Sequence, residues 1–372
     1  MIRLDRLLAI ARKEVIQLRR DRRSLILAFL LPVLLVVIFA YGISWDVRHI
    51  RTAVVDLDWS ARSRALVEAF RSSGYFEIEE AATTRDIDRR IDRGSIQLAL
   101  VISPDFSETL GSGQPALVQA IVDGSDANTA TIILGYAQAV VQAHTRAVLA
   151  GKGVESRPPI RLETRVWYNE ELVSRNMIVP GLVAVIMMII AAMLTSLTIA
   201  REWERGTMEQ LAATPVHPAE VVLGKLLPYL VIGVIDVVVT TLIGVIVFDV
   251  PFRGSAVVLM IASTLFLIGA LGLGMFISAA TRSQLLATQL AMIVTFLPAF
   301  LLSGFMYAIE VMPRGLQLVT YVIPARYFVV VTRGVFLKGV GPNVLFVQAL
   351  MMVAFAAVGL VLSTRVFKKE IA

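Results

Sequence analysis

Cysteine is absent from the chain of 372 residues, and there are only three histidines. Without cysteine, disulfide bonds, thiolate metal sites and a cysteine nucleophile are excluded. The histidines, His49, His144 and His217, are far apart in the sequence and match no metal-binding spacing. The residues therefore predict no metal site.

Motifs for nucleotide binding and catalysis are also missing. Gly224-Lys225 is followed by Leu226, and Gly151-Lys152 by Gly153, so neither pair completes a P-loop. No Gly-x-Ser-x-Gly turn and no His-Glu-x-x-His motif occurs. We expect no catalytic residue in this chain, and no ATP bound by a P-loop.

Charged residues are scarce, at 17%, whereas 57% of the residues are hydrophobic. This composition is too apolar for a soluble protein. Six stretches have about the 20 apolar residues that a helix needs to cross a bilayer, and lipid offers no partner to a bare backbone. We predict a polytopic α-helical membrane protein with spans at Leu25–Ser44, Ile178–Ala200, Leu226–Phe248, Val257–Ala280, Leu285–Ser303 and Val344–Ser363.

The net charge of +6 is concentrated near the N-terminus. Residues 1–24 contain eight Lys/Arg and three acidic residues, whereas residues 46–175 contain fifteen and eighteen. A basic cluster beside the first span orients a membrane protein, so we expect no nucleic-acid partner. Residues 1–24 also have a helical period, which predicts an amphipathic helix at the lipid surface. A cluster that only orients the chain is the alternative, and both can hold.

The distribution of basic residues predicts that both termini are cytoplasmic. With this orientation, the short inside segments contain fifteen Lys/Arg and the short outside segments contain five. An excess of Lys/Arg on the cytoplasmic side is the usual bias of short loops. We therefore read residues 25–45 as an uncleaved first transmembrane helix and place residues 46–175 outside the cytoplasm.

Strand and helix patterns alternate within residues 46–175, which predicts a small α/β domain. We expect strands at 50–56, 75–79, 95–103, 115–122 and 160–168, and helices at 59–72, 85–93 and 128–150. The spans from the second to the sixth then occupy residues 176–372. Within them, residues 305–338 are apolar but interrupted by Pro313 and Pro324, which predicts a re-entrant or interfacial element.

A dense polar segment follows the second span: Arg201-Glu-Trp-Glu-Arg-Gly-Thr-Met-Glu-Gln-Leu211. Its charges recur at helical spacing, so residues 201–214 are predicted to continue as a helix on the cytoplasmic surface. Gly206 permits a bend, and Thr214-Pro215 should end the helix. A second helix begins near Pro218. A solvated connecting loop is the alternative interpretation.

This segment resembles the permease subunits of ATP-binding-cassette (ABC) transporters, in the ABC type-2 exporter family. The similar residues are Arg-Glu-x-Glu-Arg-Gly-Thr-x-Glu-x-Leu from Arg201, Thr-Pro-x-x-Pro-x-Glu from Thr214 and Gly-Lys-x-x-Pro-Tyr from Gly224. Ala11-Arg-Lys-Glu14 and a first span containing Pro32 also match. The resemblance covers the whole chain, and it is strongest to the branch with a large extracytoplasmic domain between the first two spans.

The resemblance implies that the segment after the second span is a coupling helix that contacts a separate ATPase subunit. The loop around Arg282 would make a second, smaller contact. The residues carried over by position are Arg201, Glu202, Glu204, Arg205, Gly206, Thr207, Glu209 and Arg282. The implied partners are that ATPase with its ATP and Mg²⁺, a second permease subunit, a periplasmic adaptor where one is recruited, and membrane lipid. The implied location is the bacterial inner membrane.

A transport path is expected among the spans. Asp236 is the one charged residue inside a predicted span, where a charge is costly. It is a polar group on the path, a proton or cation site, or a carboxyl hydrogen-bonded to a neighbouring span. In the family the 305–338 region helps to close the outer end of the path, which adds Glu310, Arg326 and Tyr327 as candidates.

The predicted function is export of an amphipathic small molecule, such as a drug or a lipid-like compound, by a non-catalytic membrane subunit. Two other classes remain open. One is a membrane sensor or scaffold whose extracytoplasmic domain binds a ligand. The other is an ion-coupled carrier that uses Asp236.

Overall fold

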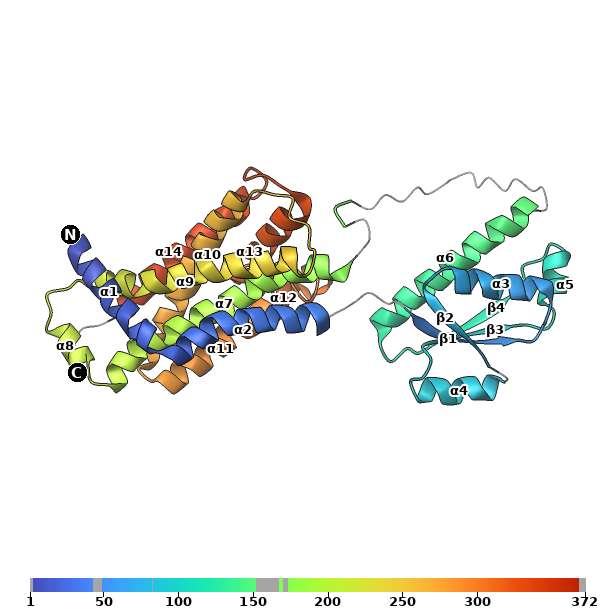
Figure 1. Ribbon diagram of the computed structural model, residues 1–372, viewed down its shortest axis with the longest axis horizontal. Coiled ribbons are helices and arrows are strands. Elements are labelled where there is room, and N and C mark those ends of the chain that lie inside the picture. The colour runs from blue at the N-terminus through green and yellow to red at the C-terminus, as the bar shows by residue number, and fades with distance from the viewer. Residues whose placement is uncertain (1–2, 43–48, 82, 152–166, 170–172, 368–372) are drawn as a thin grey trace. The chain divides into compact units, whose positions relative to one another are not determined.

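The computed structural model describes residues 3–42, 49–81, 83–151, 167–169 and 173–367. The chain divides into two compact units, Met1–Ile43 with Val166–Ala372, and Ser44–Arg165. The first is a helical unit and the second is an α/β unit (Figure 1). Each is described by itself.

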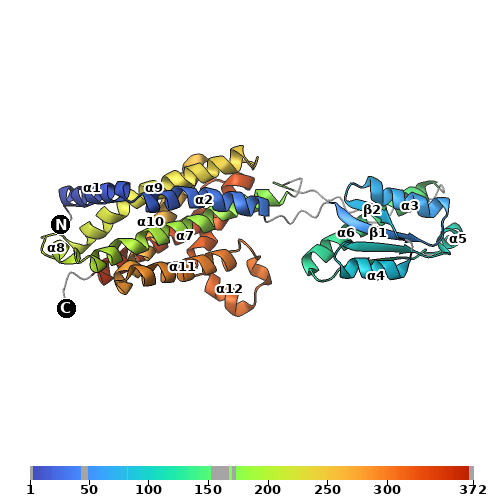
Figure 2. The same ribbon diagram turned by 60° about the horizontal axis from the view of Figure 1, so that its bottom comes forward.

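Among the described residues, six helices are long and apolar enough to cross a membrane, which confirms the predicted number of spans. All six lie in the helical unit (Figures 1 and 2). They are α2 (Arg22–Gly42), α7 (Ser174–Glu204), α9 (Pro218–Ile246), α10 (Ala256–Thr281), α11 (Gln284–Leu301) and α14 (Phe346–Val366).

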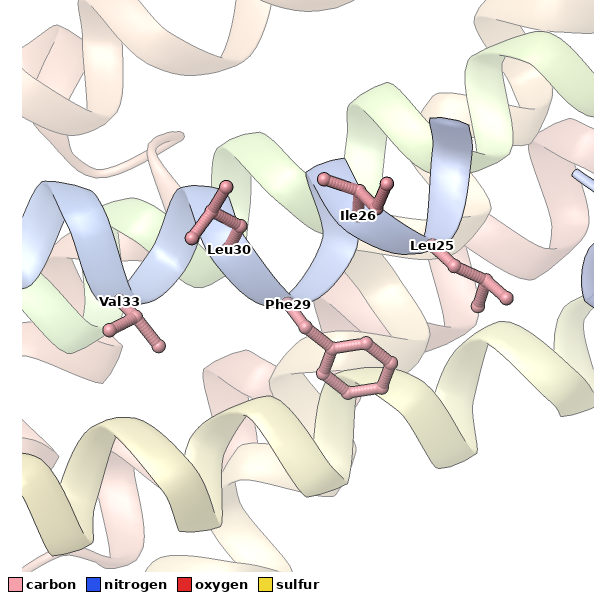
Figure 3. Close-up of a pocket in the computed structure, with 5 residues that line it drawn as sticks. All are labelled: Leu25, Ile26, Phe29, Leu30 and Val33. Carbon is pink, nitrogen blue, oxygen red and sulfur yellow. The ribbon is translucent and has the colours of Figure 1, made fainter. Parts of the chain in front are cut away.

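Helix α7 forms the centre of the helical unit. In its most apolar stretch 83% of the residues are buried, against 22% in α2, α11 and α14. The hydroxyl of Thr195 in α7 donates to Leu271 O of α10 at 2.9 Å. Because most residues of the outer helices are not buried, these helices leave apolar faces open. One such face contains a hollow of about 580 Å³ that five side chains of α2 line (Figure 3). Such faces suit lipid or another transmembrane helix.

Glycines allow α10 to approach its neighbours closely. A Cβ atom added at Gly272 would lie 2.8 Å from the backbone of Gly359 in α14, and one added at Gly274 would lie 2.3 Å from Ala192 O in α7. In lipid the hydrophobic effect does not drive helices together, and association depends instead on van der Waals packing. Small residues at helix crossings allow that close packing. The small residues of α10 thus lie at close helix contacts.

The amphipathic helix α1 (Leu4–Arg20) precedes α2, and the chain changes direction at Asp21. Helix α1 lies against α9 (Figure 2). Ala11, Glu14 and Leu18 are buried, whereas Leu4 and Leu8 stay exposed. After packing, α1 therefore retains an apolar side that is suited to the lipid surface.

Residues 305–338 fold as short helices: η1 (Ile309–Val311), α12 (Arg314–Thr320), α13 (Pro324–Arg333) and the π-helical turn η2 (Gly334–Lys338). Helix α12 and the α13–η2 helix are bent by 81° relative to each other. Pro324 begins the second helix, because its missing N–H costs nothing at the first helical turn. A broken span or a re-entrant loop has this geometry.

The α/β unit contains a four-stranded sheet in the order β2-β1-β3-β4. Strands β1 (Ile50–Asp56), β2 (Phe76–Glu80) and β3 (Leu98–Ile102) are parallel, and β4 (Val118–Val122) is antiparallel to β3. The helices are α3 (Ala61–Ser72), α4 (Thr84–Asp92), α5 (Phe106–Gly111) and α6 (Ala127–Gly151). The strand predicted at 160–168 falls mostly outside the described residues.

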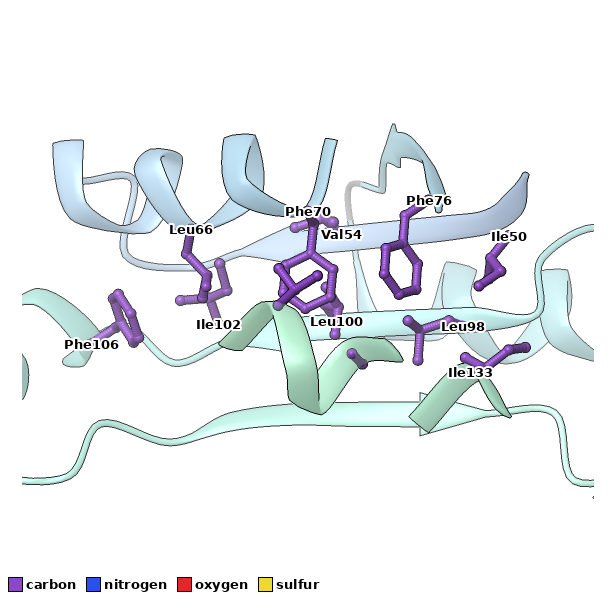
Figure 4. Close-up of a cluster of buried hydrophobic side chains, with 12 residues drawn as sticks. Ile50, Val54, Leu66, Phe70, Phe76, Leu98, Leu100, Ile102, Phe106 and Ile133 are labelled. Carbon is purple, nitrogen blue, oxygen red and sulfur yellow. The ribbon is translucent and has the colours of Figure 1, made fainter. Parts of the chain in front are cut away.

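Side chains alternate between the two faces of the sheet, and each face has its own core. Ile50 and Val54 of β1 pack with Phe70 of α3 on one face (Figure 4). Ala53 and Val55 pack with Ile87 of α4 on the other. Since both faces are covered, the unit has a core of its own.

Candidate functional site

The polar segment after the second span forms a helix, a turn and a short second helix, in place of the single helix predicted over 201–214. Helix α7 ends at Glu204, and α8 spans only Met208–Ala212. Gly206 lies between them with φ +69°, a left-handed conformation that glycine adopts without strain. The prediction allowed a bend at Gly206, but in the structure the helix ends before Gly206 and a new one begins after it.

A buried ion cluster lies directly behind this turn and joins three helices. Lys225 of α9 donates to Glu14 Oε2 of α1 at 3.0 Å and to Glu202 Oε1 of α7 at 3.2 Å. The side chains of Lys225 and Glu14 are 3% exposed and that of Glu202 is 5% exposed. Tyr229 donates to Glu14 Oε1 at 3.0 Å. Buried charges are tolerated only when they are paired in this way.

Two further groups complete the buried ion cluster from its more exposed side. Lys13 of α1 donates to Glu202 Oε1 at 2.9 Å, and the hydroxyl of Thr207 donates to Glu202. Thr207 belongs to the turn between α7 and α8. Glu202 therefore connects the turn to α1 and α9 at the same time.

The beginning of α9 is also attached to α1. Glu220 accepts a hydrogen bond from His217 N, which closes a capping box, and another from Arg3 N at 2.7 Å. A Cβ atom at Gly224 would lie 2.9 Å from Leu7 O, so glycine permits this close approach. Helix α1 is thus fixed to α9 by backbone contacts as well as by the buried ion cluster.

The loop before α11 holds the end of α7 from the other side. Glu204 accepts a hydrogen bond from Gln284 N at 2.7 Å, and the guanidinium of Arg282 lies 4.4 Å from the centre of the Trp203 ring. Arg201 pairs with Asp21 at 3.1 Å. The structure thus brings the Arg282 loop and the end of α7 together.

The eight predicted coupling residues differ in what they offer to a partner. Arg201, Glu202, Glu204, Thr207 and Arg282 use their side chains inside the chain. Arg205 and Glu209 are exposed. Within the described part of the chain, their side chains have no charged partner closer than 4 Å. Glu204 and Arg282 are also exposed, but their side chains contact other residues of the chain, so Arg205 and Glu209 are the two charges of the eight that are left for a partner.

The predicted path residues do not form one site. The Arg326 side chain donates to Thr320 and lies 4.0 Å from the centre of the Tyr321 ring, while Tyr327 donates to Tyr321 O at 2.8 Å. Both therefore hold the bend between α12 and α13. Glu310 is exposed in η1. Asp236 is buried in α9, and no hydrogen bond between described residues links it to this group.

Sequence reasoning did not select Lys13, Glu14, Lys225 and Tyr229 as functional residues. Glu14 is 211 residues away from Lys225, so no local pattern pairs them. A signal was nevertheless available, because both positions belong to the motifs that carry the family resemblance.

Among the described residues, no group of three or more His, Asp or Glu could hold a metal ion.

Comparison with known proteins identifies the family of this chain. A family model described as "ABC-2 family transporter protein" matches residues 22–365. The chain belongs to the ABC-2 transporter family. Membership makes this ABC-2 chain a transporter permease, and it implies partnership with an ATPase. With six spans, it is a multi-pass membrane protein.

Several relatives match nearly the whole ABC-2 chain. "Probable multidrug ABC transporter permease YbhS" of Escherichia coli (strain K12) is 38% identical over 94% of this chain and 93% of its own length. "Probable multidrug ABC transporter permease YbhR" of the same strain is 31% identical over 90% of each chain. "Inner membrane transport permease YhhJ" is 28% identical over 86% of this chain and 85% of its own.

Proposed function

We propose that the chain is the membrane subunit of an ATP-driven exporter that moves an amphipathic small molecule out of the cytoplasm or the inner leaflet. ATP and Mg²⁺ bind to a separate ATPase subunit, because this chain lacks a P-loop. The permease itself is non-catalytic. Its relatives YbhS and YbhR are named multidrug permeases, and the scarcity of charge within the spans favours an amphipathic substrate.

The observation that supports coupling most directly is the buried ion cluster behind the α7–α8 turn. A partner that presses on Arg205 and Glu209 moves Thr207 and Glu202, and Glu202 is bonded to α1 and α9 through Lys13 and Lys225. Breaking such pairs is costly, so the three helices move together. Since α7 is the central helix, its movement reaches the interior of the unit.

The remaining partners follow from the same assignment. A second permease subunit, identical or paralogous, packs on the exposed apolar faces of the outer helices, and α1 rests on lipid. The protein lies in the bacterial inner membrane. Six crossings leave both termini on one side, which the basic residues assign to the cytoplasm. A periplasmic adaptor would meet the α/β unit outside the membrane.

The test is co-purification of an ABC ATPase subunit with the permease from native membranes. The variant is Arg205→Glu with Glu209→Lys, which reverses both exposed charges and leaves the buried ion cluster intact. We expect at least a tenfold loss of bound ATPase, equivalent to about 1.4 kcal/mol, with normal membrane insertion.

The matched control is Arg314→Glu, an exposed charge in α12 at the opposite end of the helical unit from α8 (Figure 2). It should retain the ATPase. Stoichiometric ATPase on the double variant would refute the coupling assignment. Transport into inverted vesicles that continues without ATP but stops with an uncoupler would instead identify an ion-coupled carrier, and a co-purifying kinase would identify a sensor.

A further inference from the structure

The middle of α9 contains a carboxyl group that the coupling site does not use. Asp236 is 1% exposed, and its Oδ2 atom has no hydrogen-bond partner within the part of the chain that the structure describes. Thr240, one turn further on, donates to the backbone oxygen of Asp236 at 2.7 Å. One of the three roles predicted for Asp236 was a hydrogen bond from its carboxyl to a neighbouring span. That bond is not observed at Oδ2.

A second buried group without a partner lies at the same level on α10. Ser263 is 0% exposed, and its Oγ atom has no hydrogen-bond partner among the described residues. A Cβ atom at Gly233 would lie 3.0 Å from Leu267, which sets the register between α9 and α10. The two helices are consecutive and antiparallel, so four residues further along α9 and four back along α10 place Ser263 near the level of Asp236 and Val237. Neither Ser263 Oγ nor Asp236 Oδ2 is hydrogen-bonded to the other.

Among the residues that the structure describes, no opposite charge pairs with Asp236. The helices packed against α9 are α1, α2, α7, α10 and α14. On α9 itself the nearest ionisable group is Tyr229, seven residues or about 10 Å along the axis, and it is bonded to Glu14. On α2, α7 and α14 the ionisable side chains are confined to the first and last turns, and α10 has none between Ala256 and Thr281. Glu14 of α1 meets Lys225 near the start of α9.

Arg333 of α13 is a partly buried cation, and its guanidinium is already occupied. It donates to Gly304 O at 2.9 Å and to Phe305 O at 3.0 Å. It also reaches Met177 O at the start of α7, which is near the level of Gly244, because a Cβ at Gly244 would meet Val179. Gly244 is eight residues, or about 12 Å, from Asp236 along α9.

An ionised Asp236 would have no countercharge beside it, and its Oδ2 atom has no donor among the described residues. A charged acid at the centre of a span costs about 2.5–3.5 kcal/mol on insertion scales, whereas a neutral carboxylic acid needs only one acceptor for its proton. We infer that Asp236 is a proton-binding site, which in this conformation holds a neutral carboxylic acid.

This site links protonation to the conformation of the permease. When the interface of α9 and α10 opens to water, the acid can lose its proton to a water molecule, and the resulting carboxylate is hydrated. Closing the interface then requires a proton to be taken up again. The closed conformation binds the proton more tightly, so low pH favours it and high pH disfavours it.

Infrared spectroscopy of the purified full-length permease at neutral pH tests this inference. The wild type should show the carbonyl band of a protonated carboxylic acid, and the band should shift on exchange into D₂O. Asp236→Asn should remove it. Asp236→Glu should keep a shifted band, which covers the case in which the asparagine variant does not fold.

The matched control is Asp249→Asn, which removes an exposed carboxylate just beyond the end of the same helix and should leave the band unchanged. A wild type without a protonated-acid band that depends on Asp236 would overturn the inference. So would a band that appears only after sodium is removed, since a metal cation would then occupy the site. The measurement needs no ATPase, so its failure would leave the proposed coupling untouched.

Discussion

At the scale of single residues, Lys225 makes the two central ion pairs of the buried ion cluster. Its ammonium group lies between the carboxylates of Glu14 and Glu202, and all three side chains are at least 95% buried. Lys225→Met keeps the length of the side chain but leaves two buried carboxylates close together, with only Lys13 at the edge. Removing one partner of a buried ion pair costs about 3–5 kcal/mol.

We therefore expect Lys225→Met to lower the thermal unfolding temperature of the detergent-solubilised permease substantially. Adding Glu14→Gln should recover part of the loss, because one uncompensated charge is removed. Lys338→Met, at an exposed lysine, is the control and should change stability by no more than about 0.5 kcal/mol. An unfolding temperature for Lys225→Met equal to that of the wild type would contradict the pairing.

The same residues show what the sequence could and could not predict about the site. Charges at helical spacing correctly marked the end of α7 as polar and partly exposed. They did not reveal that Glu202 faces inward while Arg205 faces outward, because that depends on the turn at Gly206. Nor could they pair Glu14 with Lys225, since contacts over 211 residues depend on how α1 packs on α9.

At the scale of helices, the contact between α10 and α7 depends on Gly274. An added Cβ would lie 2.3 Å from Ala192 O and 2.3 Å from Thr195 Oγ1, and backbone cannot move aside as a flexible side chain can. Gly274→Ala should therefore force the two helices apart. Overpacking of this kind typically costs about 1–3 kcal/mol.

Thermal unfolding of the Gly274→Ala permease in detergent measures this cost. Gly315→Ala is the control, because Gly315 lies in α12 with no atom within 4 Å of an added Cβ. Alanine there should be neutral or stabilising by roughly 0.5–1 kcal/mol, since glycine is unfavourable in a helix. Equal unfolding temperatures for the two variants would mean that α7 and α10 are not in close contact.

The elements themselves were largely predictable. Strand β1 occupies the predicted residues, and the predicted strands at 75–79 and 115–122 correspond to β2 and β4. Helix α5 was not predicted, because a helix of six residues is too short to show a period. The order of the sheet could not be read from the chain either, since strand pairing is a long-range property.

At the scale of the whole molecule, the chain combines a helical unit with an inserted α/β unit that has its own core. The bias of basic residues predicts that the α7–α8 turn is in the cytoplasm and that the inserted unit is outside. The proposed coupling to a cytoplasmic ATPase requires this orientation. An inverted orientation would place Arg205 and Glu209 outside the cytoplasm, where a cytoplasmic ATPase could not bind them.

The natural absence of cysteine makes this orientation directly measurable. Gln210→Cys in α8 and Ser125→Cys in the loop after β4 both place a thiol at an exposed position. In intact spheroplasts, a membrane-impermeant maleimide should label Ser125→Cys at once and Gln210→Cys only after permeabilisation, because a charged reagent cannot cross the hydrocarbon core. The unsubstituted chain is the control and should not be labelled at all. Labelling of Gln210→Cys from outside would place the α7–α8 turn on the wrong side for a cytoplasmic ATPase, and the proposed coupling would then fail whatever the variants of Arg205 and Glu209 had shown.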